Sequence, residues 1–488
     1  MRCSTASALR SKLGHPVIDV DGHHLEYLPA LDRHLKAAMG DRLFYRWLAS
    51  EMAAPASLDE RRSRRAAQPG WWTATPVTEL HDRAASALPR LLRHRMDDLG
   101  IDFMIMYTSV GLRGMLEPDD EVRRAFCSAM NRFYADYYLV FGDRLTPACV
   151  IPMFTPEEAL AELDRCHGLG FKVVHMAHGI PRPIPDIHRR YPELYPGVHW
   201  LDTFGLDSEF DYDVVWRRLT ECGFAATFHG HSAHASAVRS SRSPSNYVFN
   251  HLGAHGTLMQ EVCKSLILGG VTNRFQSLQF AFLEGGVHWA CGLVNDFIEH
   301  WERRNIASIH VLDPQRLDRT AMKRIIGTWG DSFVEDDDAK DSMWLYANRR
   351  EGAQGDTAAP ANRDDFAACE LHTASDIQRL FGNMYFGAEA DDRTVHCAFR
   401  PSNSMSIRLR AMFSSDYGHW DVGVPAQLLL HSYDLVREEL LSSEEFREFV
   451  ADNAIRLHGT LNRTFWQGTV VEGYASEVLG PAGKMPRD

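Results

Sequence analysis

The stretch VIDVDGHHLE, residues 17–26, decides the fold of this chain. It begins as a short apolar run rich in β-branched residues, which predicts a buried strand. Side chains alternate between the two faces of a strand, so we expect Asp21 and His23 to point the same way. A carboxylate beside an imidazole at the mouth of a buried strand is half of a divalent-metal site. The structural alternative is that Asp21 caps the next helix and His23 is a hydrogen-bonded core histidine.

Length and composition restrict the class of protein. A chain of 488 residues is long for one domain but suits one large α/β barrel with insertions. The net charge of -13, without a basic stripe, argues against a nucleic-acid partner. Nine scattered cysteines without a CxxC pair favour reduced thiols and a cytoplasmic location. We see no signal peptide and no apolar run long enough to span a bilayer, so we expect no membrane partner.

Strand-like and helix-like segments alternate along most of the chain. After the first strand, we expect strands at 101–107, 145–152, 171–176, 225–229, 278–284, 384–389 and 409–416. Helical spacing is found at 27–47, 77–99, 118–141, 156–169, 212–222, 255–268 and 287–304, with two more helices at 424–457. Eight such repeats predict a (β/α)₈ TIM barrel as one domain over 1–488.

Two segments interrupt the repeat and are expected to be insertions. One lies near 180–210, is rich in Pro and Tyr, and is expected to be irregular. The other lies near 310–380 and includes an acidic stretch at 331–365 that is poor in apolar residues. That composition predicts an exposed segment.

Metal-type ligands stand at four of the predicted strand ends. They are Asp21 and His23 on the first strand, His229 on the fifth, Glu284 on the sixth and Asp416 on the eighth. A barrel brings its strand ends together, and carboxylates with imidazoles suit one or two ions of Zn²⁺, Mn²⁺ or Fe²⁺. The alternative is that each of these residues is a core polar group with hydrogen-bond partners of its own. We disfavour it because all five residues fall at the ends of strands and are expected to face the same way.

The chain resembles the amidohydrolase superfamily, in the amidohydrolase-related branch that holds non-oxidative decarboxylases and several hydrolases. The matching pieces follow the family's order at 21–26, 99–107, 143–147, 169–172, 228–230, 269–271, 284–286 and 414–421. The resemblance implies that Asp21, His23, His229 and Asp416 are metal ligands and that Asp416 also accepts a proton. This sequence departs from the superfamily pattern in having Asp-x-His on the first strand and Glu284 where a histidine is frequent. Glu284 could ligate or bridge a second metal, or act as a base.

Two catalytic functions and one non-enzymatic function remain open at this point. The first is a metal-dependent hydrolase of an ester, thioester or amide, with Asp416 or Glu284 taking the proton of a metal-activated water. The second is a metal-dependent non-oxidative decarboxylase of an aromatic or unsaturated carboxylic acid, in which Asp416 protonates carbon. The third, a binding protein on a retained barrel, is disfavoured because no expected ligand position is Ala or Gly.

Several further residues have expected roles. We expect His255, His288 and Trp72 to contact a small carbonyl substrate, whereas His24, Lys172 and Asp102 are expected to be structural. A homodimer is left open as the oligomeric state.

Overall fold

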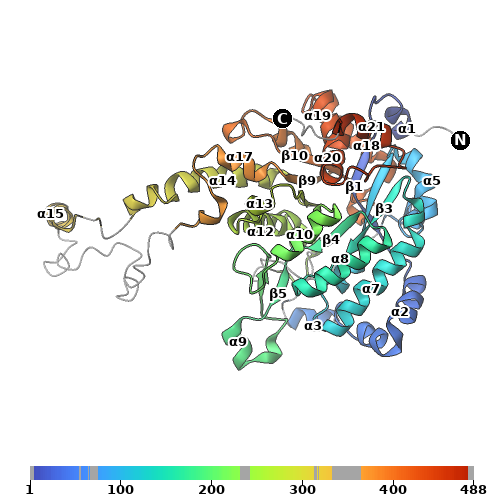
Figure 1. The fold of residues 1–488 in the computed structure, drawn as a ribbon, viewed down its shortest axis with the longest axis horizontal. Coiled ribbons are helices and arrows are strands. Elements are labelled where there is room, and N and C mark those ends of the chain that lie inside the picture. Colours follow the sequence, from blue (N-terminus) through green and yellow to red (C-terminus); the bar gives the residue numbers. More distant parts are fainter. Residues whose placement is uncertain are drawn as a thin grey trace.

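The computed structural model describes residues 5–53, 57–63, 65, 75–230, 242–312, 316, 318–331 and 364–481. Its main sheet has eight strands in the order β1-β2-β3-β4-β7-β8-β9-β10, and each pair with a printed register is parallel (Figure 1). The strands are β1 (Ile18–His24), β2 (Phe103–Thr108), β3 (Leu145–Val150), β4 (Val173–Ala177), β7 (Ala226–His229), β8 (Phe280–Phe282), β9 (Met384–Glu389) and β10 (Arg410–Ser414). All eight predicted strands are therefore confirmed.

Backbone hydrogen bonds join the ends of the first and last strands. The amide of Asp416 donates to the carbonyl of Asp21 at 3.0 Å, and the amide of His23 donates to the carbonyl of Tyr417 at 2.7 Å. These bonds bring the segment after β10 against β1, so the sheet curves round into the predicted TIM barrel.

Helices cover the outer face of the barrel (Figure 1). They include α2 (Leu28–Leu48), α7 (Asp120–Tyr137), α8 (Pro156–Leu169), α10 (Asp213–Cys222), α12 (Ala254–Leu268) and α14 (His288–Arg304). Local signals fix their ends: Thr155 and Glu158 form a capping box at the start of α8, and Gly170 ends it in the left-handed conformation.

Two predicted helical stretches are divided differently in the structure. The stretch 77–99 contains α4 (Leu80–Ala85) and α5 (Pro89–Leu99), because Pro89 suits the first turn of a new helix. The stretch 424–457 contains α18 (Leu428–Arg437), α19 (Ser443–Arg447), the π-helical η14 (Glu448–Asp452) and α20 (Asn453–Gly459). A further helix, α21 (Glu472–Leu479), follows them.

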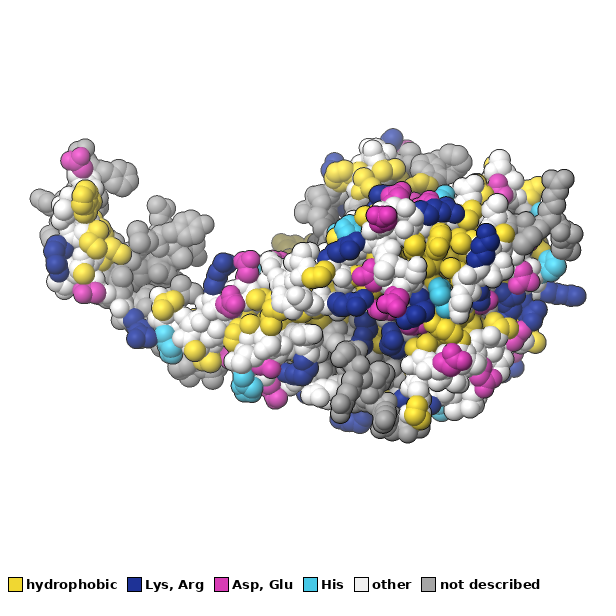
Figure 2. Space-filling model, turned by 90° about the horizontal axis from the view of Figure 1, so that it is seen from above, with side chains coloured by type: hydrophobic (Ala, Val, Ile, Leu, Met, Phe, Trp, Pro, Cys, Tyr) yellow, Lys and Arg dark blue, Asp and Glu magenta, His cyan; other side chains and the backbone are white. Residues whose placement is uncertain are grey.

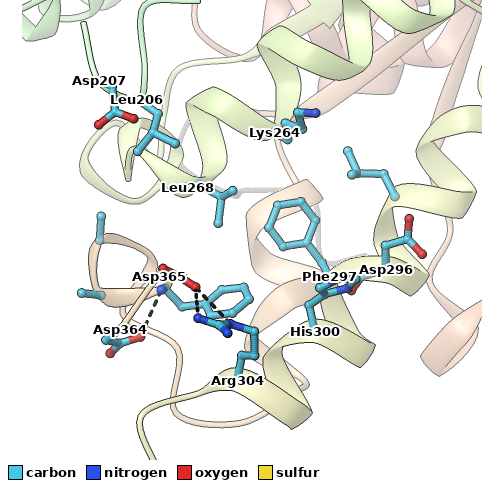
Figure 3. A pocket seen from close by; sticks show the side chains of 14 residues that line it. Leu206, Asp207, Lys264, Leu268, Asp296, Phe297, His300, Arg304, Asp364 and Asp365 are labelled. Carbon is cyan, nitrogen blue, oxygen red and sulfur yellow. Dashed lines mark hydrogen bonds and ion pairs between the residues drawn. The ribbon is translucent and has the colours of Figure 1, made fainter. Parts of the chain in front are cut away.

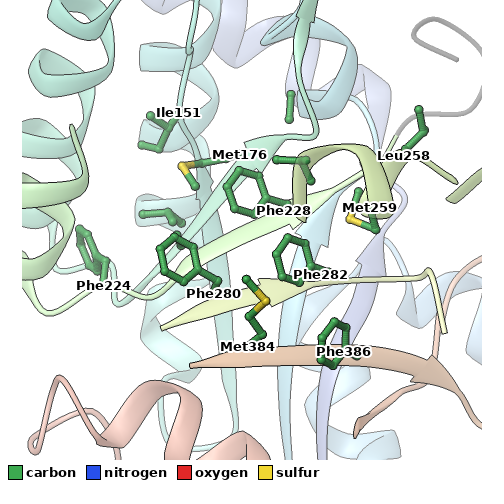
Figure 4. Packing of buried hydrophobic residues seen from close by; sticks show 14 of the residues in the cluster. Ile151, Met176, Phe224, Phe228, Leu258, Met259, Phe280, Phe282, Met384 and Phe386 are labelled. Carbon is green, nitrogen blue, oxygen red and sulfur yellow. The ribbon is translucent and has the colours of Figure 1, made fainter. Parts of the chain in front are cut away.

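The strands carry apolar side chains on both faces, as expected for a buried parallel sheet. Figure 4 shows the layer between the barrel and α12, where Phe228, Phe282 and Phe386 come from three adjacent strands. Their rings stack at 5.8 Å for both neighbouring pairs. Because side chains alternate along a strand, an outward Phe228 turns its neighbours Thr227 and His229 toward the barrel interior.

The segment near 180–210 is more regular than the sequence predicted. β5 (Ile180–Arg182) pairs antiparallel with β6 (Trp200–Asp202), and α9 (Pro185–Arg190) lies between them. The buried Arg182 donates to Asp202 at 3.1 Å and to the carbonyl of Phe154 at 2.7 Å, so the hairpin is tied to the barrel. This long-range pairing has no periodic signature in the sequence.

The described helix of the second insertion lies away from the barrel. α14 leads toward α15 (Arg319–Trp329), which lies apart from the barrel in both whole-molecule views (Figures 1 and 2). Most of the acidic stretch predicted at 331–365 lies outside the described residues. Figure 2 shows acidic and basic side chains interspersed over the visible face. Within the described ranges, no helix is both long and apolar enough to cross a membrane.

Candidate metal centre

A bulge in β1 decides which of its side chains face the barrel interior. Ile18 and Val20 belong to the interior apolar cluster, so simple alternation would turn Gly22 inward. The register with β2 shifts by one residue between Asp19 and Gly22. The extra residue reverses the alternation of side chains along β1. Asp21 and His23 therefore point into the barrel at its mouth, the end where the strands finish.

Two site carboxylates have an unusual backbone conformation. Glu284 follows β8 with φ of 58°, and Asp416 follows β10 with φ of 51°. The left-handed region is sparsely populated by residues other than glycine and is often occupied at functional sites. Gly418, with φ of 106°, lies so close to β1 that an added Cβ would be 2.8 Å from the carbonyl oxygen of His23. The turn after β10 is therefore fitted closely to β1.

Four of the five predicted ligands converge around one point of the mouth. His23 Nε2 lies 3.5 Å from Asp21 Oδ1 and 3.2 Å from Asp416 Oδ1. His229 Nε2 lies 3.9 Å from Asp21 Oδ1. All these atoms are buried, and none makes a directed hydrogen bond within the described residues. Converging buried lone pairs without donors fit a bound cation.

Neighbouring groups orient these ligands. Ser414 Oγ donates to Asp21 Oδ2 at 3.0 Å, which leaves Oδ1 facing His23. His229 Nδ1 lies 2.8 Å from the carbonyl oxygen of Gly230, so a proton on Nδ1 leaves Nε2 as the ligand atom. Asp19 accepts from the amide of Ser415 at 2.9 Å and so holds the end of β10 beside β1. Such supporting bonds are typical around metal ligands.

Glu284 lies beside this group and contacts two histidines. Its Oε2 is 2.7 Å from His229 Nε2 and 2.7 Å from His255 Nδ1. On the other side, His419 Nδ1 lies 2.7 Å from Asp416 Oδ1, and its ring stacks on His23 at a centroid distance of 4.0 Å. The structure thus places all five predicted metal ligands in one connected group.

The electrostatics of the mouth indicate a shortage of positive charge. Burial raises the pKa of Asp21 to about 7, although His229 opposes the shift. Burial and the neighbouring Glu284 carboxylate also raise the pKa of Asp416 well above its usual range. Burial lowers the pKa of His229, but Glu284 and Asp21 outweigh it and raise the pKa to about 9. A divalent cation bound here would favour the ionised form of the two carboxylates and the neutral form of His229.

The other sequence predictions have different outcomes. His255 lies next to Glu284, whereas His288 is exposed at the start of α14; Trp72 lies outside the described residues. His24 packs outside the group, with its ring 4.0 Å from that of Tyr138. Lys172 donates to the carbonyl of Phe465 at 2.8 Å, which confirms a structural role.

The sequence did not single out three histidines that complete the surroundings of the site. His175 of β4 is buried, and its ring lies 5.6 Å from that of His229. The spacing of His251 and His419 does not separate them from the other histidines of the chain, and only the fold does so. Strand alternation gives a signal for His175, since Val173, two residues before it, belongs to the interior cluster.

A surface cavity of about 680 Å³ contains none of the metal-site residues (Figure 3). It lies on the outer side of the barrel helices, between Lys264 of α12 and His300 of α14. Arg304 crosses it to pair with Asp365 at 2.8 Å. Its size alone does not connect it with the chemistry of the mouth.

Comparisons with known proteins bear on the fold. The sequence matches no protein-family model and no curated protein. The structure is similar to that of an amidohydrolase from Mycobacterium avium subsp. paratuberculosis K-10, with a TM-score of 0.52 and 17% identity over 92% of this chain and 100% of that one. A 5-carboxyvanillate decarboxylase from Sphingomonas paucimobilis has a TM-score of 0.46 and 16% identity over 91% of this chain and 98% of that one. The first similarity confirms the barrel fold that the family resemblance implies.

Proposed function

We propose that this chain is a metal-dependent enzyme of the amidohydrolase superfamily that hydrolyses an ester, thioester or amide bond of a small organic substrate. The observation that supports it best is the convergence of buried, unpartnered ligand atoms from Asp21, His23, His229 and Asp416 at the barrel mouth. In this fold, chemistry takes place at the carboxyl ends of the strands.

A divalent ion held by these four residues would supply Lewis acidity, which makes water more acidic and polarises a carbonyl oxygen. The chain's own residues would move the protons. Asp416 lies 2.7 Å from His419, so this pair can accept a proton from water and pass it to the leaving group. Glu284, held between His229 and His255, offers a second carboxylate that stays ionised because the two histidines outweigh its burial and keep its pKa well below the usual range.

The rival function, non-oxidative decarboxylation, would use the same ligand set. Purified protein, loaded separately with Zn²⁺, Mn²⁺ or Fe²⁺, should be assayed against matched esters, thioesters and amides and against aromatic carboxylic acids. We expect metal-dependent release of a carboxylic acid from one of the first three classes, and its loss in Asp416→Asn. Metal-dependent release of carbon dioxide without hydrolysis would replace this proposal by decarboxylation, and turnover in metal-free protein would overturn both.

A further inference from the structure

The helix α15 carries a stripe of apolar residues and lies away from the barrel. Met322, Ile325, Ile326 and Trp329 recur at the spacing i, i+3, i+4 and i+7, which places them on one helix face. Ile325 is 56% exposed and Trp329 is 81% exposed. Both whole-molecule views show α15 apart from the barrel (Figures 1 and 2). Because large apolar side chains gathered on one exposed face mark an interaction site, this face of α15 is suited to bind a protein surface.

The surface cavity of about 680 Å³ offers apolar surface of the kind that would cover this stripe (Figure 3). Five large apolar residues line it: Leu206, Leu268, Leu293, Phe297 and Phe366. The chain leaves the barrel at this cavity, because Arg304 at the end of α14 lines it, and returns there, because residues 364–368 line it too. The cavity therefore lies at the barrel end of the same insertion that carries α15.

The charges of the cavity and of α15 are complementary. The two cations of the cavity lining, Lys264 and Arg304, are each already paired with a carboxylate at 2.8 Å. Three other carboxylates of the lining form no ion pair with Lys or Arg within the described residues: those of Asp207, Asp296 and Asp364. On α15, Lys323 and Arg324 are exposed and likewise form no ion pair within the described ranges. Free carboxylates around an apolar cavity thus match free cations beside an apolar stripe.

We propose that two copies of this chain exchange α15 reciprocally, so that the helix of each copy docks in the cavity of the other. The occupant is a second copy because both complementary surfaces belong to one chain, in which α15 lies away from its own cavity. A two-fold axis can lay the two insertions side by side in opposite directions, which brings α15 of each copy to the barrel end of the other insertion. Such a contact is the same on both subunits and closes as a dimer.

Within this contact, the side chains of Ile325 and Trp329 enter the apolar part of the cavity, and Lys323 and Arg324 face its free carboxylates. Tryptophan is enriched among the residues that carry most of the energy of an interface, so Trp329 is the main anchor. The exchange is independent of the reaction that the barrel mouth performs, and no residue of the metal site takes part in it.

Sedimentation velocity over a series of protein concentrations tests the exchange without an activity assay. We expect a wild-type dimer, and we expect a helix variant with both Ile325→Ser and Trp329→Ser to dimerise roughly tenfold or more weakly. A cavity variant, Leu206→Arg, should weaken the dimer to a similar degree, because Leu206 is 43% exposed and the longer charged side chain would block the cavity. Val140→Ser, which removes an apolar side chain that is 74% exposed on η1 (Leu139–Phe141), should keep the wild-type dimer.

An equimolar mixture of the helix variant and the cavity variant tests the reciprocity. A mixed dimer keeps one intact contact, between the unchanged α15 of the cavity variant and the unchanged cavity of the helix variant, whereas neither variant alone keeps any. The mixture should therefore associate more strongly than either variant by itself. Circular dichroism identifies a variant that fails to fold, and Leu206→Ser then replaces Leu206→Arg.

Three results would overturn the exchange. The first is a monomeric wild type, which would leave α15 to some other occupant. The second is a wild-type dimer that survives either the helix variant or the cavity variant, because the contact between subunits would then lie elsewhere. The third is a mixture that associates no more strongly than its two components.

Discussion

Charged side chains at the two ends of the barrel have different partners. The base is the end where the strands begin, and the mouth is the end where they finish. At the base, Asp102 accepts from the amide of Val17 at 2.7 Å and pairs with Arg10. Arg144 pairs with Asp97 at 2.6 Å and donates to the carbonyl of Ile101 at 2.7 Å. At the mouth, the carboxylates of Asp21, Glu284 and Asp416 contact histidines, and within the described residues none of them pairs with Lys or Arg.

This difference shows which end is complete without a ligand. The base satisfies its polar groups with amides, carbonyls and opposite charges of the chain itself, as expected where side chains serve stability. The mouth leaves Asp21 Oδ1 and both carboxylate oxygens of Asp416 buried without hydrogen-bond partners within the described residues. Within the described residues, the mouth is therefore the end of the barrel whose buried acceptor atoms a bound cation would complete.

Among substitutions at the two ends of the barrel, we expect those of Asp416 and His229 to have the largest effect on activity. Asp416→Asn and His229→Ala should each lower turnover by several orders of magnitude, because each removes a proposed metal ligand, and Asp416 is also the proposed proton acceptor. Both variants should stay folded, which circular dichroism would check. Near-normal turnover and metal content in both variants would contradict the site assignment.

Addition of metal should have a large effect on stability. A cation that binds only the folded chain at a hundredfold excess over its Kd stabilises it by ~2.7 kcal/mol. We expect the Tm of chelator-treated protein to rise when Zn²⁺ or Mn²⁺ is restored, as measured by scanning calorimetry. Asp21→Asn should show a smaller rise, and an equal rise would place the stabilising ion at some other site.

At the base, Asp102→Asn should affect stability but not metal binding. The variant weakens the bonds to the Val17 amide and Arg10, and a hydrogen bond to a charged group is worth about 1.5–3 kcal/mol. Denaturant unfolding should show a loss of this order, while metal content per chain stays at the wild-type value. A reduced metal content would mean that the two ends are coupled.

The smallest effect is expected on the outer surface. Arg218 of α10 pairs with Asp164 of α8 at 2.7 Å, and the two side chains are 33% and 58% exposed. Because solvent screens such pairs, Arg218→Ala should change the free energy of unfolding by less than about 1 kcal/mol. Denaturant unfolding measures this change, and a larger loss would show that the pair is more than a surface contact.

Strand periodicity was sufficient to predict the barrel and the residues at its mouth. Four of the eight apolar runs end in a metal-type ligand at the point where the strand ends, and the fold brings Asp21, His229 and Asp416 together as expected. The bulge in β1 was not predictable, because an extra residue leaves no mark in the hydrophobic pattern. It nevertheless determines that His23 faces inward and His24 outward.

Most of the histidines around the predicted ligands could not be selected from sequence. The chain has 24 histidines, and spacing alone does not separate His251 of α11 (Tyr247–His251) from those on the surface, whereas His255 was predicted as a substrate contact. Their role depends on where α11 and α12 lie relative to Glu284, which is a long-range property of the fold. The pairing of β5 with β6 was missed for the same reason.

The most direct measurement of the central claim is anomalous diffraction from crystals of the protein grown with Mn²⁺ or Zn²⁺. We predict a strong peak at the absorption edge of the added metal, enclosed by Asp21 Oδ1, His23 Nε2, His229 Nε2 and a carboxylate oxygen of Asp416. The matched crystal of His229→Ala should show that peak weakened or lost. A wild-type map without a peak at the mouth, with metal bound elsewhere or not at all, would contradict the assignment of this end of the barrel as a metal centre.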